Sequence, residues 1–381
     1  MREEFYQKLN KTRRVVIKVG TALLADSGAS GINHGMIEKL KNEIVFLRSR
    51  GIETLLVTSG AVGMGRETLR EMASADPAAT PGASTMARRQ ALASIGQGRL
   101  ISLYADKFKE AGVIVGQLLI TARDFRDRRA YLNVGHTLEE LIRMGILPVI
   151  NENDTVSTDE LKFGDNDLLS ATCASLFHAD LLIILTSVEG FRMGGERVPF
   201  LSSVTSAEMK EAHGPAGPGS GGMQTKIRAG QLCMMSGCSL AILPGMDASP
   251  VQSLFRGDDI GTIISGRSRP LSARKKWLLF ARTEGAVVID AGAREALVRG
   301  SSLLPAGIKS TKGRFLAGDV IEILDQQSMI CGRGIANYSY RDLQPSIGLS
   351  GSEIQKRLIL RPSPEVIHRN NMILEDSPFP G

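Results

Sequence analysis

Short apolar runs alternate with segments of helical spacing over roughly the first 260 residues of the chain. Continuous apolar runs bounded by glycine or polar clusters predict buried strands, whereas apolar positions three or four residues apart predict covering helices. Strands that alternate with helices imply a doubly wound, mostly parallel α/β sheet with helices on both faces. The predicted strands are 14–20, 54–58, 113–120, 146–150, 181–185 and 240–243, and the predicted helices are 36–50, 88–111, 131–144, 168–176 and about 226–236.

The pattern changes after residue 265. We interpret Gly266–Pro270 as a linker between a first domain of residues 1–265 and a second of residues 271–381. Short β-like runs dominate the second domain, including Ala286–Asp290 and Asp319–Ile323. This portion is therefore predicted to be a small, mostly-β domain.

Polar or glycine-rich positions follow the predicted strands of the first domain. Lys18, Ser59, Asn151, Thr186 and Gly245 all lie at or just after strand ends. Ligands of open α/β sheets bind beyond the carboxyl ends of the strands, so we expect these positions to share one crevice. A lysine such as Lys18 in a central strand is kept only if it has an anionic partner.

The densest polar stretch lies around the strand at 146–150. Asn151, Glu152, Asn153 and Asp154 follow the strand directly, and Gly164–Asp167 comes shortly after. Such carboxylates and amides could hold a substrate ammonium and orient a second anion through water or a metal. The alternative is that they only form turns, since Asn and Asp bond their own backbone.

Two glycine-rich segments could approach a ligand. The first, Ser59–Gly65, is a weak signal because such spacings also serve tight turns and helix packing. The second runs through residues 213–219 into Ser220–Lys226, just before a predicted helix, where free amides and the helix dipole favour phosphate. With Lys226 beside it we favour phosphate binding over a flexible loop, although the spacing is not that of a Walker motif.

Two further segments are polar or charged. Residues 73–87, rich in Ala, Pro, Ser and Thr, are predicted to form a mobile surface loop. Arg123–Arg129 is predicted to be a solvated helix start, with closure over the site as the alternative.

Composition excludes several classes of protein. The cysteines Cys173, Cys233, Cys238 and Cys331 form no Cys-x-x-Cys pair and the five histidines lie far apart, which disfavours a structural zinc site. The N-terminus is charged and no run is long enough to cross a bilayer, so we expect a cytoplasmic protein. The net charge of +6 suits phosphate-bearing ligands or nucleic acid without requiring either. Residues 271–381 hold 15 Lys and Arg against 11 Asp and Glu, so most of the surplus lies there.

The candidate chemistry is phosphoryl transfer. Two lysines, Lys18 and Lys226, lie near glycine-rich loops, and the sequence shows no nucleophilic triad and no clustered metal-ligand histidines. In phosphoryl transfer the protein contributes mainly positioning and charge neutralisation. Both lysines could meet the developing charge, while an acidic residue of the Gly164–Asp167 loop fixes their amines and the acceptor sits at Asn151–Asp154.

Five motifs stand out along the chain: VIKVGT at 16–21, VTSGA at 57–61, PVINEND at 148–154, FGDND at 163–167 and GSGGMQTK at 219–226. In this order they resemble the amino acid kinase family, in particular its members that phosphorylate L-glutamate. Residues 300–309 (GSSLLPAGIK) and the G-x-F-x-x-G-D-V pattern at 313–320 are similar to a PUA domain, so the resemblance covers nearly the whole chain.

The resemblance implies ATP-dependent phosphorylation of the side-chain carboxylate of L-glutamate to L-glutamyl 5-phosphate, the first step of proline biosynthesis. It also implies Mg with the ATP, feedback inhibition by L-proline and a homo-oligomer. No protein metal ligand is predicted. Carried over by motif, the glutamate-binding residues would be Ser59, Gly60, Asp154 and Asn166. The catalytic residues would be Lys18, Lys226, Asp167 and Asp165, and the ATP-binding residues would be Lys18, Thr186, Ser187, Ser220, Gly221, Gly222, Met223, Gln224, Thr225 and Lys226.

The chain departs from the family pattern at two places on the presumed nucleotide side. Ser187 stands where the family commonly has Asp after the Thr, and the segment from Met193 to Val204 is shortened. Both departures bear on nucleotide binding.

Two other functions remain open at this point. An RNA-binding or RNA-modifying protein is the rival from another class, because PUA domains occur on such enzymes and the chain is basic. The groups from Lys18 to Lys226 argue against RNA as the main partner, because they form a complete small-molecule set. A related carboxylate kinase of the same family is the nearer rival.

Overall fold

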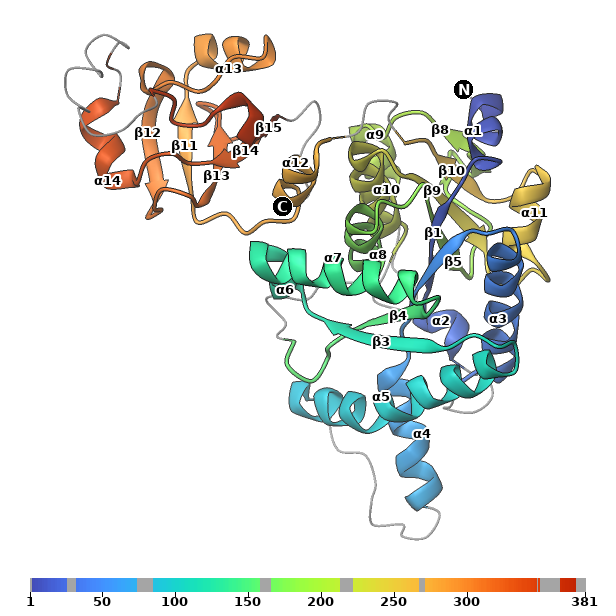
Figure 1. The fold of residues 1–381 in the computed structure, drawn as a ribbon. Helices are drawn as coiled ribbons and strands as arrows, with labels where there is room; N and C mark the ends of the chain where they lie inside the picture. The colour runs from blue at the N-terminus through green and yellow to red at the C-terminus, as the bar shows by residue number, and fades with distance from the viewer. Residues whose placement is uncertain are drawn as a thin grey trace. The chain divides into compact units, whose positions relative to one another are not determined.

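The computed structural model describes residues 2–25, 32–73, 85–157, 166–212, 222–266, 271–347, 349 and 364–374. Contacts divide the chain into two compact units (Figure 1). The first unit holds Met1–Asp124 and Arg129–Pro270, and the second holds Phe125–Arg128 and Leu271–Gly381.

The first unit is built on an eight-stranded sheet with the order β3-β4-β2-β1-β5-β9-β10-β8. Neighbouring strands run parallel, except that β10 is antiparallel to β9. The sheet is therefore doubly wound about β1, and the carboxyl ends of β1, β2, β4, β5 and β9 meet at one edge. The strands are β1 (Arg14–Val19), β2 (Glu53–Val57), β3 (Val115–Ile120), β4 (Leu147–Glu152), β5 (Leu181–Thr186), β8 (Phe200–Leu201), β9 (Ser239–Pro244) and β10 (Thr262–Ile264), and a separate hairpin joins β6 (Arg192–Met193) to β7 (Glu196–Arg197).

Helices cover both faces of this sheet (Figure 1). The helices between residues 2 and 256 are α1 (Arg2–Leu9), α2 (Thr21–Leu24), α3 (His34–Ser49), α4 (Ala61–Ala73), α5 (Met86–Lys109), α6 (Ala122–Arg126), α7 (Arg128–Arg143), α8 (Asn166–Leu176), α9 (Ser206–Glu211), α10 (Met223–Ser236) and α11 (Pro250–Arg256).

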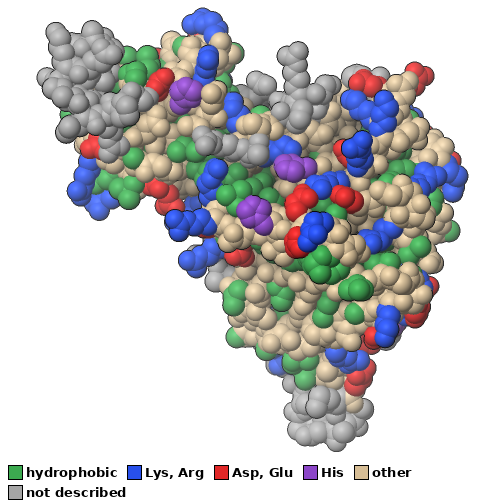
Figure 2. All heavy atoms as spheres, in the orientation of Figure 1, with side chains coloured by type: hydrophobic (Ala, Val, Ile, Leu, Met, Phe, Trp, Pro, Cys, Tyr) green, Lys and Arg blue, Asp and Glu red, His purple; other side chains and the backbone are tan. Residues whose placement is uncertain are grey.

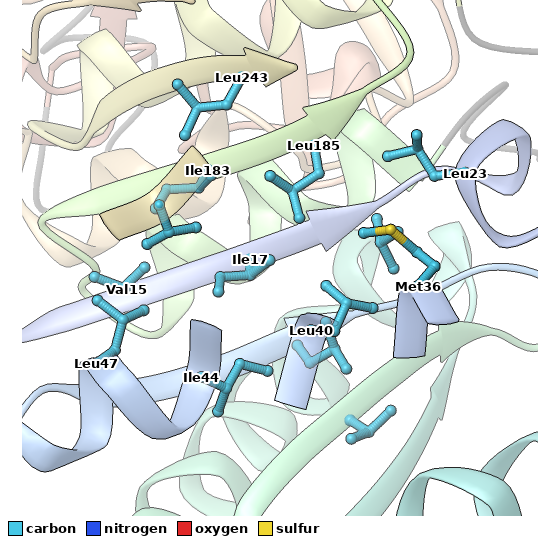
Figure 3. Packing of buried hydrophobic residues seen from close by; sticks show 14 of the residues in the cluster. Val15, Ile17, Leu23, Met36, Leu40, Ile44, Leu47, Ile183, Leu185 and Leu243 are labelled. Carbon is cyan, nitrogen blue, oxygen red and sulfur yellow. The ribbon is translucent and has the colours of Figure 1, made fainter. Parts of the chain in front are cut away.

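Alternation along β1 separates the two faces. Val15, Ile17 and Val19 belong to an apolar cluster shared with α3, α5 and α11. Figure 3 shows Val15 and Ile17 facing α3. Helix α3 contributes its apolar stripe from Met36 to Leu47 to this cluster. Successive strand residues point to opposite faces, so Lys18 lies on the other face, where α8 packs on β1.

The second unit is a five-stranded mixed sheet with the order β12-β11-β13-β14-β15. Strand β11 is parallel to β13, and the other pairs are antiparallel. Its own core contains Val287, Phe315 and Ile323. The elements are β11 (Gly285–Ile289), β12 (Ile308–Gly313), β13 (Val320–Leu324), β14 (Ile330–Ile335), β15 (Met372–Leu374), α12 (Ala273–Leu278), α13 (Ala291–Val298) and α14 (Tyr340–Leu343).

The fold confirms the predicted class, a mostly parallel α/β sheet followed by a small β-rich part. Several short elements were not predicted, among them α1, α11, β10 and α13. The segment Arg123–Arg129 forms the end of α6 and the start of α7 rather than one helix start. Most of the predicted loop at 73–87 lies outside the described residues, but α5 already begins at Met86, because Thr85 caps its N-terminus.

The Ser59–Gly65 segment is not an extended glycine-rich turn, because α4 begins at Ala61. A Cβ on Gly65 would lie 1.9 Å from the carbonyl oxygen of Leu92, and a Cβ on Gly96 would lie 1.9 Å from that of Ala61. These glycines therefore let α4 and α5 touch, so Gly65 serves helix packing rather than ligand approach.

The surface of the molecule mixes charges of both signs. On the face shown in Figure 2, Lys and Arg side chains lie among Asp and Glu. Within the described residues, no helix has the length and apolar content that a bilayer crossing requires.

Candidate active site

Lys18, Asp167 and Lys226 form one buried ion cluster at the carboxyl edge of the sheet. Lys18 Nζ donates to Asp167 Oδ1 at 2.6 Å, and Lys226 Nζ donates to Asp167 Oδ2 at 3.0 Å. Lys18 is 2% exposed, Asp167 is 0% exposed and Lys226 is 6% exposed. The structure thus supplies the anionic partner that the sequence required for Lys18.

Three elements bring this cluster together. Lys18 is the penultimate residue of β1, and Asp167 lies in the first turn of α8, where the helix dipole favours a carboxylate. Lys226 lies in the first turn of α10, which begins after its N-cap Gly222. Thr225 Oγ1 adds a donor to Asp167 Oδ2 at 2.8 Å, so both carboxylate oxygens accept hydrogen bonds.

One carboxylate is shared by two ammonium groups in a site largely removed from water. Buried charges are stable only when they are paired and hydrogen-bonded, which Asp167 provides for both lysines. Two ammonium groups held close together in this way suit a ligand that brings negative charge, such as a phosphoryl group.

A second, neutral network lies at the ends of β2 and β4. Asn166 Nδ2 donates to Thr58 O at 2.7 Å and to Ser59 Oγ at 2.7 Å, and it lies 3.3 Å from Asn151 Oδ1. All four residues are buried. Asn166 directly precedes Asp167, so the start of α8 supplies both networks.

The remaining predicted glutamate-binding residues adjoin this network. Gly60 follows Ser59 with a φ of +104°, which favours glycine. Asp154 lies in the turn after β4 and is half-buried.

The predicted nucleotide-binding residues occupy two elements. Thr186 is the last residue of β5, the strand beside β1. Its carbonyl oxygen accepts a hydrogen bond from Gly245 N at 2.7 Å. The next residue, Ser187, is exposed. Gly222 and the following residues through Lys226 form the start of α10. The predicted residues Asp165, Ser220 and Gly221 lie outside the described residues.

Sequence reasoning missed two residues that support the neutral network. Tyr104 OH lies 2.7 Å from Thr58 Oγ1, and Gln97 Oε1 accepts from Asn151 Nδ2 at 2.8 Å. Tyr104 and Gln97 lie on α5, seven residues apart and hence on the same helix face. Polar side chains at this spacing within an otherwise apolar helix face were the signal in the sequence.

Magnesium was expected to accompany the nucleotide. Asp167 does not fit as its ligand, because it is paired with the ammonium groups of Lys18 and Lys226, which would repel a divalent cation at the same carboxylate. Among the described residues, no three His, Cys, Asp or Glu side chains gather into a metal-binding group.

Known proteins resemble the chain over nearly its whole length. A model of the amino acid kinase family matches residues 13–244, and a PUA domain model matches residues 285–358. Glutamate 5-kinase of Thermoanaerobacter sp. (strain X514) is 40% identical over 95% of this chain and 97% of its own length. Glutamate 5-kinases of Trichlorobacter lovleyi and Pseudomonas putida (strain W619) are each 39% identical over 96% of this chain, covering 98% and 99% of their own lengths.

Proposed function

The chain belongs to the amino acid kinase family and, within it, to the glutamate 5-kinases, and from this premise we propose how its residues carry out the reaction. The enzyme phosphorylates the side-chain carboxylate of L-glutamate to L-glutamyl 5-phosphate, the first step of proline biosynthesis. We propose ATP as the phosphoryl donor. The observation that carries the proposal is the buried Lys18–Asp167–Lys226 cluster at the carboxyl edge.

The acceptor needs no general base. A glutamate side chain has an ordinary pKa of about 4.3, so at neutral pH its carboxylate is already the nucleophile. One carboxylate oxygen forms a bond to the γ-phosphorus while the bond from that phosphorus to the bridging oxygen of ATP breaks, and ADP leaves. The task of the protein is to bring two anions together and to neutralise charge.

Lys18 and Lys226 perform that neutralisation. An ammonium group has three N–H donors, so each lysine can donate both to Asp167 and to an oxygen of the transferred phosphoryl group. Asp167 sets the positions of the two ammonium groups, which removes the cost of arranging them during the reaction. Asp165 has a secondary role in the same task.

The nucleotide is bound by Thr186, Ser187 and the segment from Ser220 to Lys226. The start of α10 supports this assignment, because amides at a helix N-terminus and the adjoining Lys226 favour phosphate groups. Mg would be held by the nucleotide phosphates and would add further neutralisation of their charge. Ser187 and the shortened segment from Met193 to Val204 bear on nucleotide affinity.

Glutamate is bound by Ser59, Gly60, Asp154 and Asn166. Ser59 Oγ accepts from Asn166, and the serine's own O–H can still donate to a substrate carboxylate. Asp154 carries the negative charge that pairs with the substrate ammonium. A neutral network suits substrate recognition, because it holds donors in place without competing charge.

Three further properties belong to the proposal. L-proline is the feedback inhibitor, because it resembles the substrate in its α-carboxylate and amino group. The enzyme is a homo-oligomer. The enzyme acts in the cytoplasm. RNA is not proposed as a partner.

One assay tests the function. ATP-dependent hydroxamate formation is measured with L-glutamate, L-aspartate and N-acetyl-L-glutamate in parallel. We expect product with L-glutamate alone. Equal or higher activity with another acceptor would show that the protein is a different carboxylate kinase.

A further inference from the structure

A chain of buried hydroxyl groups runs from α5 to the proposed glutamate-binding residues. Tyr104 OH and Thr58 Oγ1 lie 2.7 Å apart, and Thr58 Oγ1 donates to the carbonyl oxygen of Ser59 at 3.2 Å. The single hydroxyl proton of Thr58 goes to the Ser59 carbonyl, so Tyr104 is the donor in the hydrogen bond between the Tyr104 and Thr58 hydroxyls. Burial raises the pKa of Tyr104, which keeps this donor protonated.

This hydroxyl chain sets the orientation of one peptide group. The carbonyl of Ser59 is held toward Thr58, on the side of α5. The peptide between Ser59 and Gly60 is trans, so the Gly60 N–H points the opposite way, away from α5. Gly60 has a φ of +104°, a conformation that other residues rarely adopt, so the orientation is specific to this turn.

Helix α5 supports the other strand end in the same way. Gln97, seven residues before Tyr104, accepts from Asn151 Nδ2, and Gln90, seven residues earlier again, donates to the carbonyl of Ser157 at 3.1 Å. One helix face thus contacts the ends of both β2 and β4 and the turn that follows β4. The close approach of Gly65 and Gly96 fixes α5 against α4, which begins directly after Gly60.

We propose that Tyr104 and Gln97 are positioning residues for glutamate: from α5 they fix the Ser59–Gly60 peptide and the Asn151 side chain, so that these groups face the substrate. The inference rests on the proposed function and concerns the same site. Neither residue touches the transferred phosphoryl group, so both act on glutamate binding and leave the chemical step unchanged.

The test compares kinetic constants of the full-length enzyme. Tyr104→Phe removes one oxygen atom and retains the ring, and we expect the glutamate KM to rise about three- to tenfold, the usual effect of one hydrogen bond. The turnover number and the ATP KM should stay within about twofold of wild type, since the lost interaction is equal in ground and transition states. Gln97→Met should shift the same constant in the same direction.

Thr58 supplies an independent check that does not depend on the folding of Tyr104→Phe. Thr58→Val should raise the glutamate KM, whereas Thr58→Ser, which keeps the hydroxyl, should restore it. The Tyr104→Phe/Thr58→Val double variant should show less than the product of the two single effects, because both changes break one chain.

Tyr131→Phe is the matched control. Tyr131 is a second buried tyrosine, on α7, and burial raises its pKa to about 12. Removal of the Tyr131 hydroxyl should leave the glutamate KM unchanged. A wild-type glutamate KM in folded Tyr104→Phe and Thr58→Val, or an equal change in both substrate KM values, would overturn the inference. Wild-type protein that does not phosphorylate glutamate would instead overturn the proposed function, and this measurement is made first.

Discussion

The carboxyl edge of the sheet carries two neighbouring networks that differ in charge. The first joins Lys18, Asp167 and Lys226 through ion pairs, and the second joins Ser59, Asn151 and Asn166 through neutral hydrogen bonds. Both are buried, and both include a residue from the first turn of α8. Burial and location are therefore shared, and charge is the property that separates them.

This difference follows the chemistry required of each network. Charge on the transferred phosphoryl group changes during the reaction, so fixed ammonium groups lower the barrier. Glutamate keeps its shape and most of its charge until the phosphoryl group arrives, so fixed hydroxyl and amide groups, together with Asp154 for the ammonium, are enough to bind it. The charged network should thus control turnover and the neutral network should control glutamate affinity.

The largest effect is expected from Asp167→Asn, which removes the shared carboxylate. Two nearly buried ammonium groups would lose their shared ion pair with Asp167, so the free energy of unfolding should fall by about 3–5 kcal/mol, the usual cost of breaking a buried pair. Urea denaturation measures it. Asp258→Asn, at an exposed pair with Arg256, is the control and should change stability by less than about 1 kcal/mol. Equal stability losses in the two variants would show that Asp167 does not hold the charged network together.

Lys226→Ala should act on turnover. Removing one preorganised donor to a developing charge typically lowers kcat by about 10²–10³-fold, and we expect a loss of this size with little change in the glutamate KM. Steady-state kinetics at saturating ATP measure both constants. Lys8→Ala, an exposed lysine on α1, should behave as wild type. Near-native turnover with a raised glutamate KM would assign Lys226 to substrate binding instead.

Asp154→Asn should act on glutamate affinity. The neutral amide has a similar shape, but it loses the charge that faces the substrate ammonium, at a cost of about 1.5–3 kcal/mol or roughly ten- to a hundredfold in KM. Turnover at saturating glutamate should change little. An unchanged KM would remove Asp154 from the substrate-binding residues.

The smallest effect on catalysis is expected from deleting residues 266–381, which hold all of the second unit except Phe125–Arg128. Every residue assigned to the chemistry lies before Gly266, and the second unit has its own core. A chain ending at Ser265 should retain glutamate-dependent phosphoryl transfer. Its inhibition by proline or its oligomeric state can differ from that of the full chain. Loss of residues 271–381, which carry most of the positive surplus, should weaken any salt-sensitive RNA binding. A folded but inactive truncation would mean that the second unit completes the site.

Much of this arrangement could be predicted because strand ends are visible in the sequence. The buried strands, the glycine-rich start of α10 and the Asn-Asp pair that begins α8 placed Lys18, Asp167 and Lys226 at one edge. The ion cluster could be expected from Lys18 alone, since a lysine in a central strand needs an anion. Which acidic residue would be its partner followed only from the resemblance.

The supporting residues on α5 could not be predicted in the same way. Tyr104 and Gln97 are far in sequence from Thr58 and Asn151, and their roles depend on how α5 packs against the sheet. That packing is set by the close approach at Gly65 and Gly96, which sequence reasoning could not separate from a turn near a ligand. Contacts between distant elements decide such roles, and local patterns do not contain them.

The division of labour between the two networks is tested most directly by measuring kcat and the glutamate KM for Lys18→Ala and Asn166→Ala side by side. We predict that Lys18→Ala lowers kcat by about 10²-fold or more and leaves KM within about threefold. Asn166→Ala should raise the KM by about tenfold or more and leave kcat within a few-fold. If both variants change kcat and KM by the same factors, the charged and neutral networks do not have separate functions and the account is wrong.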